Sequence, residues 1–285
     1  MRLRKLALLV LFAGLAAGCR STADVAEPMG QFFNGSRSTS AVAAFDTDLV
    51  SQLRDSQDTI VMIYNHGTDW GGKFQDCEPD TMPGFMEHWG ANGIDGHDVL
   101  VFYLCAQVAE DFGAMGSARS RENEAVLDQL LAAGVPARNI FVVGHSGGAS
   151  TALLTAERAP TKFNSAIVSA PGYGFAWLEA EGAGDQWIDV EYDKWRSPLA
   201  YADDMSAYAL LYEGDIWAPP GDAAFLGQHP NVEVVTIYDT NLDGELCKGL
   251  DEPHFYWWTA CFAQTEMRDV ELFVLERLEN REWAL

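Results

Sequence analysis

Basic residues are scarce in this chain of 285 residues. Lys and Arg number 18 against 42 Asp and Glu, which gives a formal net charge of -24. So acidic a surface repels nucleic acid and anionic lipid headgroups, and we expect neither as a partner. Anionic substrates are also disfavoured, because they need a local basic cluster that so few Lys and Arg do not suggest. The composition therefore argues against nucleic acid, anionic lipid and anionic substrates.

The N-terminus lacks an apolar run long enough for a transmembrane helix. The run Leu6–Leu15 is shorter than the roughly 20 residues that span a bilayer. Basic residues precede it and small residues follow it, so residues 1–18 are predicted to be a secretory signal peptide. The small residues before Cys19 resemble a bacterial lipobox, which implies cleavage before Cys19 and lipidation of its thiol. An ordinary signal peptide cut near Ala17 is the alternative.

Residues 19–42 separate the export signal from the rest of the chain. They contain Ser, Thr, Gly and Asn without periodicity, which predicts a flexible tether after the lipidated Cys19. Residues 43–285 remain, enough for one large α/β domain with a sizeable core. We therefore expect an exported lipoprotein of the outer membrane or cell envelope, held to the membrane by its lipid anchor only. A periplasmic or secreted protein is the alternative.

Short apolar runs alternate with helix-like segments through this domain. Such alternation predicts right-handed β-α-β units and a mostly parallel sheet, here of about six to seven strands flanked by helices. The predicted strands are 59–64, 99–104, 139–143, 165–169, 207–212 and 232–238, with at most one more near 31–33. The predicted helices are 83–91, 119–133, 149–158 and 255–278, with a weaker one at 222–226. Residues 173–204 break the rhythm and are interpreted as a lid-like insertion.

The pentapeptide Gly144-His145-Ser146-Gly147-Gly148 is the most informative local motif. An apolar run precedes it and a helix-like run follows it. In this context a G-x-S-x-G serine is held on a strained turn with its hydroxyl exposed. Small residues two positions before and after the serine let the strand and the helix approach closely. Ser146 is therefore predicted to be a nucleophile.

With this motif and two further features, the chain resembles the α/β-hydrolase family. The resemblance covers roughly residues 58–280. The family's order of nucleophile, acid and histidine is matched by Ser146, Asp215 and His254. Asp215 follows a predicted strand and precedes a proline by four residues, like the family's acid loop. His254 follows the last strand and opens the terminal helix. The resemblance implies an α/β-hydrolase fold with the catalytic groups at the carboxyl ends of the strands.

The three residue types suit acyl transfer. A serine hydroxyl is a poor nucleophile until a base takes its proton, and a histidine can do so near neutral pH. A carboxylate beside that histidine holds the ring in the right tautomer and stabilises the imidazolium. The resemblance implies these roles for Ser146, His254 and Asp215.

Other side chains compete for the acid and base roles. Glu213 is the alternative acid, and Asp215 is preferred because Glu213 would point in a different direction. His66 and His145 are the nearest rivals of His254. His145 is expected to pack sideways beside the nucleophile, and His66 to shape the loop that binds the oxyanion. A helix-capping role is the alternative for His254.

An oxyanion hole for this chemistry uses two backbone N–H groups. One is predicted to be that of Gly147, directly after the nucleophile and at the positive end of a helix. The other is predicted to be that of Thr68, just after His66-Gly67. The sequence has H-G-T here, where the family often has H-G-G-G.

Five cysteines less Cys19 leave four, and an even count in an exported chain suggests two disulfides. The four show no C-x-x-C or Cys/His zinc spacing. On the hydrolase fold, Cys77 and Cys105 would lie on the active-site face, while Cys247 and Cys261 would flank the catalytic histidine. We therefore expect the pairs Cys77–Cys105 and Cys247–Cys261. Four buried thiols are the alternative.

Aromatic residues collect near the same predicted face, among them Trp70, Phe74, Trp217 and 255–258. They predict an apolar pocket under the lid-like insertion, which suits a small-molecule ester with an apolar or aromatic part. Core packing is the alternative for several of them, Trp257 and Trp258 included.

An acidic turn near the C-terminus matches the start of a calcium loop, D-x-[DN]-x-[DN]-G. Its candidate ligands are Asp239, Asn241, Asp243 and Glu245. Leu250 occupies the position where the motif needs Glu, so a plain Asp/Gly turn is the better interpretation. We predict no required cofactor and keep calcium as a secondary hypothesis.

These observations favour a serine hydrolase that cleaves carboxylic esters through an acyl-enzyme at Ser146. A peptidase or thioesterase using the same triad stays open, because the motif fixes the reaction class better than the bond. A hydrolase-like surface binding protein without catalysis is the alternative from another class. A dehalogenase with an aspartate nucleophile is disfavoured by the serine at the turn.

Overall fold

A mostly parallel sheet forms the centre of the molecule. The computed structural model describes residues 27–34, 43–45, 57–68, 82–106, 112–172, 182, 185–238, 247 and 253–279. Its strands are β1 Met29–Phe33, β2 Ala43–Ala44, β3 Ile60–Asn65, β4 Val99–Cys105, β5 Ile140–His145, β6 Ser165–Ser169, β7 Ala207–Tyr212 and β8 Val232–Ile237. Within the described residues they form one eight-stranded sheet in the order β2-β1-β4-β3-β5-β6-β7-β8. Strands β3 to β8 are parallel, and β1 and β2 form an antiparallel edge.

The edge and the length of the sheet refine the sequence-based expectation. The strand expected near 31–33 is present as β1, which pairs with β4 in antiparallel register, Gln31 opposite Tyr103. The two-residue β2 extends the edge by one further strand that the sequence did not predict. Its shortness explains the omission, because two alanines carry no alternation that a pattern could detect.

The central strands are buried on both faces, as their apolar runs predict. In β3 every residue is buried, and alternate side chains face opposite sides of the sheet. Ile60, Met62 and Tyr64 join one hydrophobic cluster, whereas Val61 and Ile63 join the other. The sheet therefore separates two cores.

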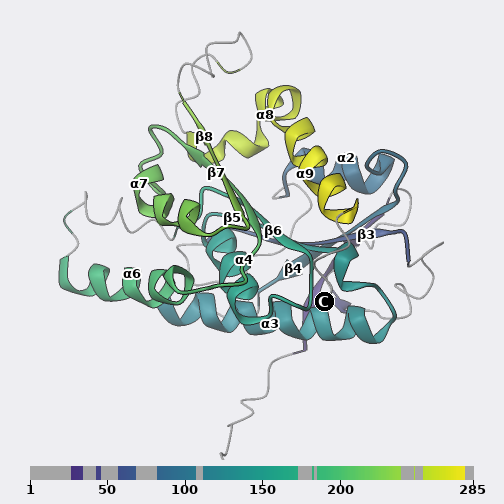
Figure 1. Cartoon of the computed structure of the whole chain (residues 1–285), viewed down its shortest axis with the longest axis horizontal. Helices are drawn as coiled ribbons and strands as arrows, with labels where there is room; N and C mark the ends of the chain where they lie inside the picture. The colour runs from purple at the N-terminus through teal and green to yellow at the C-terminus, as the bar shows by residue number, and fades with distance from the viewer. Residues whose placement is uncertain are drawn as a thin grey trace, which may run out of the picture.

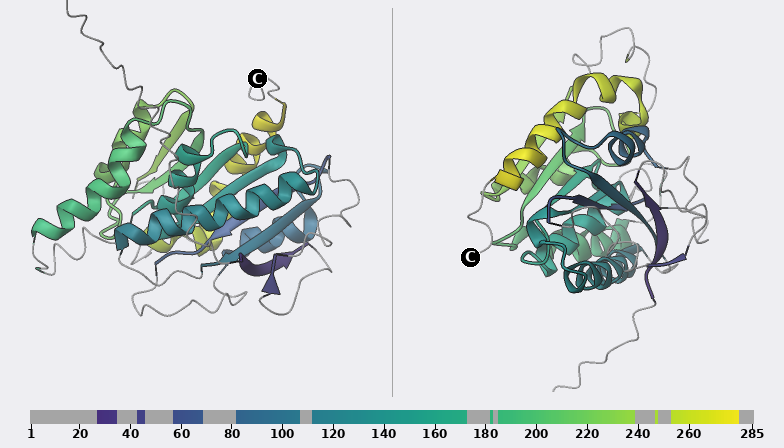
Figure 2. Two further views of the ribbon diagram at one scale, coloured as in Figure 1. Left: turned by 90° about the horizontal axis from the view of Figure 1, so that it is seen from below. Right: turned by 90° about the vertical axis from the view of Figure 1, so that its right-hand side faces the viewer.

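Helices cover both faces of the sheet. They are α2 Gly84–Asn92, α3 Phe112–Ala132, η2 Ala137–Asn139, α4 Gly147–Arg158, α6 Asp185–Ala200, α7 Pro220–Ala223, η3 Ala224–Gln228, η5 Pro253–Trp258, α8 Ala260–Thr265 and α9 Met267–Glu279, where η marks a 3₁₀ helix. Helices α3, α4 and α6 lie on one face, and α2, α8 and α9 on the other (Figure 1). Figure 2 shows the same layers from two further sides. This is the three-layer arrangement of an α/β protein.

The prediction of one continuous terminal helix over 255–278 is wrong. The segment is helical but is divided into η5, α8 and α9. Phe255 has non-helical dihedral angles, φ -97° and ψ 16°, inside η5. Thr259 then caps α8, its side-chain oxygen accepting a hydrogen bond from the N–H of Phe262. Local capping therefore restarts the helix just after His254.

Most of the described part of the segment 173–204, expected as a lid-like insertion, is helix α6. Its buried Trp195 and Leu199 belong to the cluster that also contains side chains of α3 and α4. Helix α6 thus lies in the layer of crossover helices, between β6 and β7. Residues 173–181 of the same segment are outside the described residues.

The export signal predicted for residues 1–18 and Cys19 lie outside the described residues. Of the predicted tether 19–42, residues 27–34 are described, and they contain β1, which is paired in the sheet. No helix in the described part of the chain is long and apolar enough to cross a membrane.

Candidate active site

Ser146 sits on a left-handed turn between β5 and α4. Its φ is 54° and its ψ is -122°, values that an L-residue adopts only when the surrounding structure enforces them. Here the Ser146 N–H donates to the carbonyl of Ser169 at 3.0 Å, and the Ser146 carbonyl accepts from the N–H of Ser150 at 3.1 Å. The turn predicted from the pentapeptide is therefore present and is held by its neighbours.

The glycines of the pentapeptide are required by close backbone approach. A Cβ built on Gly144 would lie 2.3 Å from the carbonyl oxygen of Gly148. One built on Gly148 would lie 2.2 Å from the carbonyl oxygen of Asn65 and 2.4 Å from that of His66. A side chain at position 144 would push the start of α4 away from β5, and one at position 148 would push it away from the end of β3.

Asp215 and His254 form a buried pair at the same end of the sheet. The Nδ1 atom of His254 lies 2.8 Å from Oδ2 of Asp215, and the two residues are 5% and 3% exposed. Because a carboxylate only accepts, His254 Nδ1 carries the proton and Nε2 is left to act as a base. The other oxygen, Oδ1, accepts from the N–H groups of Trp217 and Ala218 at 2.8 and 3.0 Å. The carboxylate is thus held on both oxygens, whereas Glu213 is exposed.

His145 positions the backbone that carries His254. Its Nε2 donates to the carbonyl oxygen of His254 at 2.7 Å, and the two rings meet edge to face with centroids 4.7 Å apart. Burial, and then the neighbouring ring of His254, lower the pKa of His145 well below its ordinary value, so this ring is neutral. His145 therefore packs sideways, as the resemblance implied. Because His145 directly precedes Ser146, its hydrogen bond holds the backbone of His254 close to the serine turn.

The loop after β3 lies against the serine turn. A Cβ added to Gly67 would be 3.4 Å from the Cβ of Ser146 and 3.5 Å from Nδ1 of His145. The Nδ1 of His66 donates to the carbonyl oxygen of Gly67 at 2.7 Å. His66 therefore shapes this loop and does not take the place of His254 beside Asp215. Thr68 and Gly147, the predicted oxyanion donors, are the next residue of the loop and the first residue of α4.

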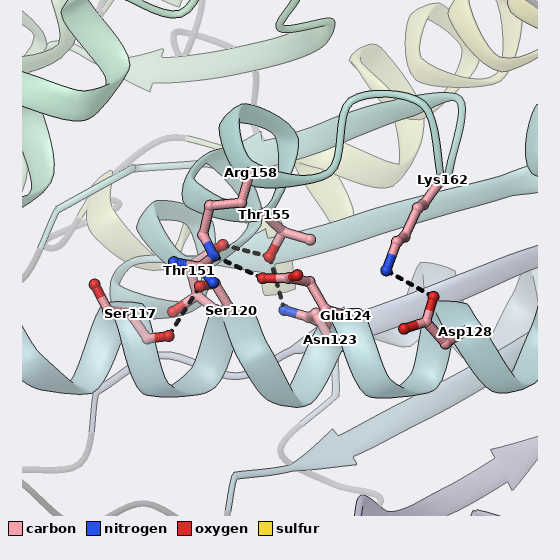
Figure 3. Close-up of polar contacts among 9 residues, drawn as sticks. All are labelled: Ser117, Ser120, Asn123, Glu124, Asp128, Thr151, Thr155, Arg158 and Lys162. Atoms are coloured by element: carbon pink, nitrogen blue, oxygen red, sulfur yellow. Dashed lines mark hydrogen bonds and ion pairs between the residues drawn. The ribbon is translucent and has the colours of Figure 1, made fainter. Parts of the chain in front are cut away.

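A buried polar network connects the end of β3 to α4 through α3. Asn65 and Asn123 exchange two side-chain hydrogen bonds, of 3.2 and 3.0 Å. Asn123 also donates to Thr155 at 3.2 Å, and Thr155 and Thr151 each donate to the carbonyl four residues earlier, at 2.8 Å. Figure 3 shows Asn123 and Thr155 facing each other between the two helices.

Partly exposed ion pairs also connect α3 to the last residue of α4 and to the turn that follows α4. Arg158 Nε lies 2.6 Å from Glu124, and Lys162 Nζ lies 2.6 Å from Asp128 (Figure 3). Such pairs are partly solvated and contribute little, about 0–1 kcal/mol each. The buried network is therefore the polar contact that fixes α3 against the site.

Apolar side chains flank the Asp215–His254 pair at the surface. Ile216 and Phe255, each directly after one of the pair, are 61% and 45% exposed. The Trp217 ring centroid lies 6.2 Å from that of His254. The expectation of core packing holds for Trp257, which is 1% exposed. The aromatic residues thus divide between core and site rim.

The disulfide Cys247–Cys261 is present, with the two Cα atoms 5.4 Å apart. It closes the segment that contains His254 onto the start of α8. Cys105 is also disulfide-bonded. Its expected partner, Cys77, lies outside the described residues, as do Trp70 and Phe74.

The candidate calcium ligands Asp239, Asn241, Asp243 and Glu245 are outside the described residues too. Among the residues that are described, no group of three or more His, Cys, Asp or Glu side chains is arranged to hold a metal ion. The calcium hypothesis stays a prediction.

Sequence reasoning missed the residues that support the site from below. Arg119 and Asn123 occupy the same helical stripe as the buried Val126, Leu127 and Leu130, and both are buried. A polar residue on an apolar stripe is the signal that would have found them, since a buried polar group must be hydrogen-bonded.

Comparison with known proteins gives matches to esterases. A family model described as a putative esterase matches residues 124–245, which is less than half of the chain. No curated protein matches the chain. The family match supports a carboxylesterase-type hydrolase.

Solved structures of esterases share the fold. Est1E from Butyrivibrio proteoclasticus is 14% identical with a TM-score of 0.50, the match covering 79% of this chain and 90% of Est1E. The apo form of esterase 2 from Thermogutta terrifontis is 11% identical with a TM-score of 0.54, covering 86% and 88%. The same esterase phosphoramylated by tabun is 10% identical with a TM-score of 0.51, covering 90% and 97%. The chain therefore has the α/β-hydrolase fold.

Proposed function

We propose that this protein is a serine hydrolase that cleaves carboxylic esters with Ser146, His254 and Asp215. The observation that carries the proposal is the buried His254–Asp215 pair, held at 2.8 Å and tied through His145 to the serine turn. A buried carboxylate that holds a histidine next to a serine on a strained turn is the arrangement that acyl transfer requires.

The proposed reaction runs in two halves. Ser146 Oγ attacks the ester carbonyl carbon while His254 Nε2 takes the hydroxyl proton, and the N–H groups of Gly147 and Thr68 stabilise the oxyanion. The intermediate collapses, the C–O bond to the alcohol breaks, and His254 returns the proton to the departing alcohol. Water then attacks the acyl-enzyme by the same route and releases the carboxylic acid and free Ser146.

A labelling experiment tests this proposal. The wild-type domain should react covalently with a fluorophosphonate probe, and Ser146→Ala should not label and should lose ester hydrolysis. Ser150→Ala is a matched control, because Ser150 lies one turn further along α4 and is fully buried. Absence of wild-type labelling, or equal labelling of Ser146→Ala, would contradict the serine mechanism and favour a binding role.

We infer a neutral substrate with an apolar part. The exposed Ile216 and Phe255 beside the pair offer apolar contact, and a net charge of -24 opposes anionic groups. Neutral p-nitrophenyl esters should therefore be cleaved faster than a hemisuccinate ester of similar size. A matched anilide and thioester, tested in the same assay, distinguish esterase from peptidase and thioesterase activity.

We also propose that the protein is exported and lipidated on Cys19. The Cys247–Cys261 disulfide supports export, because such bonds persist in oxidising compartments. Metabolic labelling with a palmitate analogue should mark the wild-type protein and not Cys19→Ser. A soluble, unlabelled wild-type product in the culture supernatant would instead favour secretion.

A further inference from the structure

Arg119 is a buried cation directly behind the loop after β3. It lies on α3 and is 1% exposed. One guanidinium nitrogen, Nη2, donates to the carbonyl oxygen of His66 at 2.7 Å. Guanidinium stays charged in proteins, and removing it from water costs several kcal/mol, so a buried arginine needs well-placed acceptors. The acceptor of this hydrogen bond is thus a main-chain carbonyl next to the proposed oxyanion hole.

The two carbonyl groups of this loop are both held by side chains. Arg119 holds that of His66, and the His66 ring holds that of Gly67 at 2.7 Å. A trans peptide is planar, so fixing a carbonyl also fixes the N–H of the following residue in the opposite direction. The contact from Arg119 therefore sets the direction of the Gly67 N–H, and the contact from His66 sets that of Thr68.

The serine turn limits the loop from the other side. Gly148 contacts the carbonyl groups of Asn65 and His66 so closely that a Cβ there would overlap both. The His66 carbonyl is thus confined between the Arg119 guanidinium and the backbone of α4. Asn123, one helical turn after Arg119, holds the side-chain amide of Asn65 through two hydrogen bonds. One face of α3 therefore holds two consecutive residues at the end of β3.

We propose that Arg119 is a positioning residue. It orients the oxyanion loop, residues 66–68 after β3, so that the loop stabilises the negative charge of the oxyanion. The inference rests on the proposed function. Hydrogen bonds from preorganised donors stabilise a developing oxyanion strongly in a site that excludes water. Arg119 holds the His66–Gly67 peptide directly, and the adjoining Gly67–Thr68 peptide is held by the ring of His66. Arg119 does not touch the substrate and acts on the position of both peptides through the first. Its loss lets these peptides rotate, so the donors no longer converge when the negative charge appears.

The test compares Arg119→Met with Arg121→Met in ester hydrolysis. Arg121 is on the same helix and is exposed, so it controls for loss of one positive charge. For Arg119→Met we expect kcat to fall by about a hundredfold to a thousandfold, as for loss of one oxyanion donor, with KM almost unchanged. Binding of a trifluoromethyl ketone, which forms a hemiketal oxyanion on the serine, should weaken by the same factor. Arg121→Met should match the wild type.

Arg119→Lys keeps the positive charge and a donor but lacks the planar fork, and it should recover part of kcat. If Arg119→Met is too unstable to purify, Arg119→Lys carries the test through its own drop in kcat at constant KM. An unchanged kcat in either variant, or a loss confined to KM, would overturn the inference. Failure of the proposed function is separate, because the wild type would then neither hydrolyse esters nor label with fluorophosphonate.

Discussion

The two faces of the sheet are packed with different chemistry, and each holds one half of the proposed site. The face under α3 and α4 places the buried polar side chains of Arg119 and Asn123 against the end of β3, and Thr155 accepts a hydrogen bond from Asn123 behind them. The opposite face holds η5 and α8 with aromatic rings. There the Phe85 ring lies 5.2 Å from that of Trp257 and 4.8 Å from that of Phe262.

The difference follows from what each half must position. An oxyanion hole consists of main-chain N–H groups, whose direction is controlled by hydrogen bonds to the neighbouring carbonyls. A histidine ring on a loop needs its backbone segment to be fixed, and here packing and a disulfide do this together with the hydrogen bond from His145 to the His254 carbonyl. Polar and aromatic packing therefore serve different tasks within one site.

The largest expected effect is on kcat and comes from Asp215, whose carboxylate binds His254 in the half of the site with aromatic packing. Asp215→Asn keeps the shape but removes the charge that selects the His254 tautomer, so kcat for ester hydrolysis should fall by about 10⁴-fold. Steady-state kinetics with a p-nitrophenyl ester measure the change. Glu213→Gln is the control and should leave kcat near the wild-type value. A larger loss in Glu213→Gln would assign the acid to Glu213.

Removing the disulfide Cys247–Cys261 should free only the segment that carries His254, in the half of the site with aromatic packing. Cys247→Ser with Cys261→Ser frees a segment with a sequence separation of 14 residues. The free energy of unfolding should drop by about 3 kcal/mol in urea titration, since the cross-link restricts the unfolded chain. Oxyanion binding, measured with the trifluoromethyl ketone, should change less than kcat. Equal stability with and without the bond would show that packing alone fixes this segment.

Cutting the polar network should affect the other half by a smaller amount. Asn123→Ala leaves the buried Asn65 short of a partner, so the free energy of unfolding should fall by about 1–3 kcal/mol. Asp128→Ala, which removes the exposed pair with Lys162, should cost less than about 1 kcal/mol. Urea titration of both variants separates the buried contact from the exposed one. The reverse ranking would contradict the role assigned to the network.

The smallest effect concerns the pH dependence of the His145 contact. Burial lowers the pKa of His145 below the unfolded value of 6.5. As pH falls below about 6.5, His145 takes up a proton in the unfolded chain but stays neutral in the folded protein. The free energy of unfolding therefore decreases, by at most about 1.4 kcal/mol per pH unit. His145→Gln still donates to the His254 carbonyl but cannot titrate. Thermal melts at pH 7.5 and 5.5 should show a smaller loss in this variant than in the wild type.

Much of the fold was predictable because strands that are buried on both faces appear in the sequence as short, continuous apolar runs. The strands at 165–169 and 207–212 have the expected bounds, and the other central strands differ by one or two residues at their ends. The serine turn was predictable because Gly144 and Gly148 must approach each other closely within one pentapeptide. The broken terminal helix and β2 were not, since a single cap and two alanines leave little pattern.

By itself the sequence determined the order of strands and helices, the acidity of the surface and the glycine spacing around Ser146. Those properties depend on neighbouring residues or on composition. Only the tertiary structure decided that Asp215 and not Glu213 meets His254, that His145 holds the His254 carbonyl, and that Arg119 reaches His66. These contacts join residues 39, 109 and 53 positions apart, and folding alone brings such distant side chains within hydrogen-bond distance.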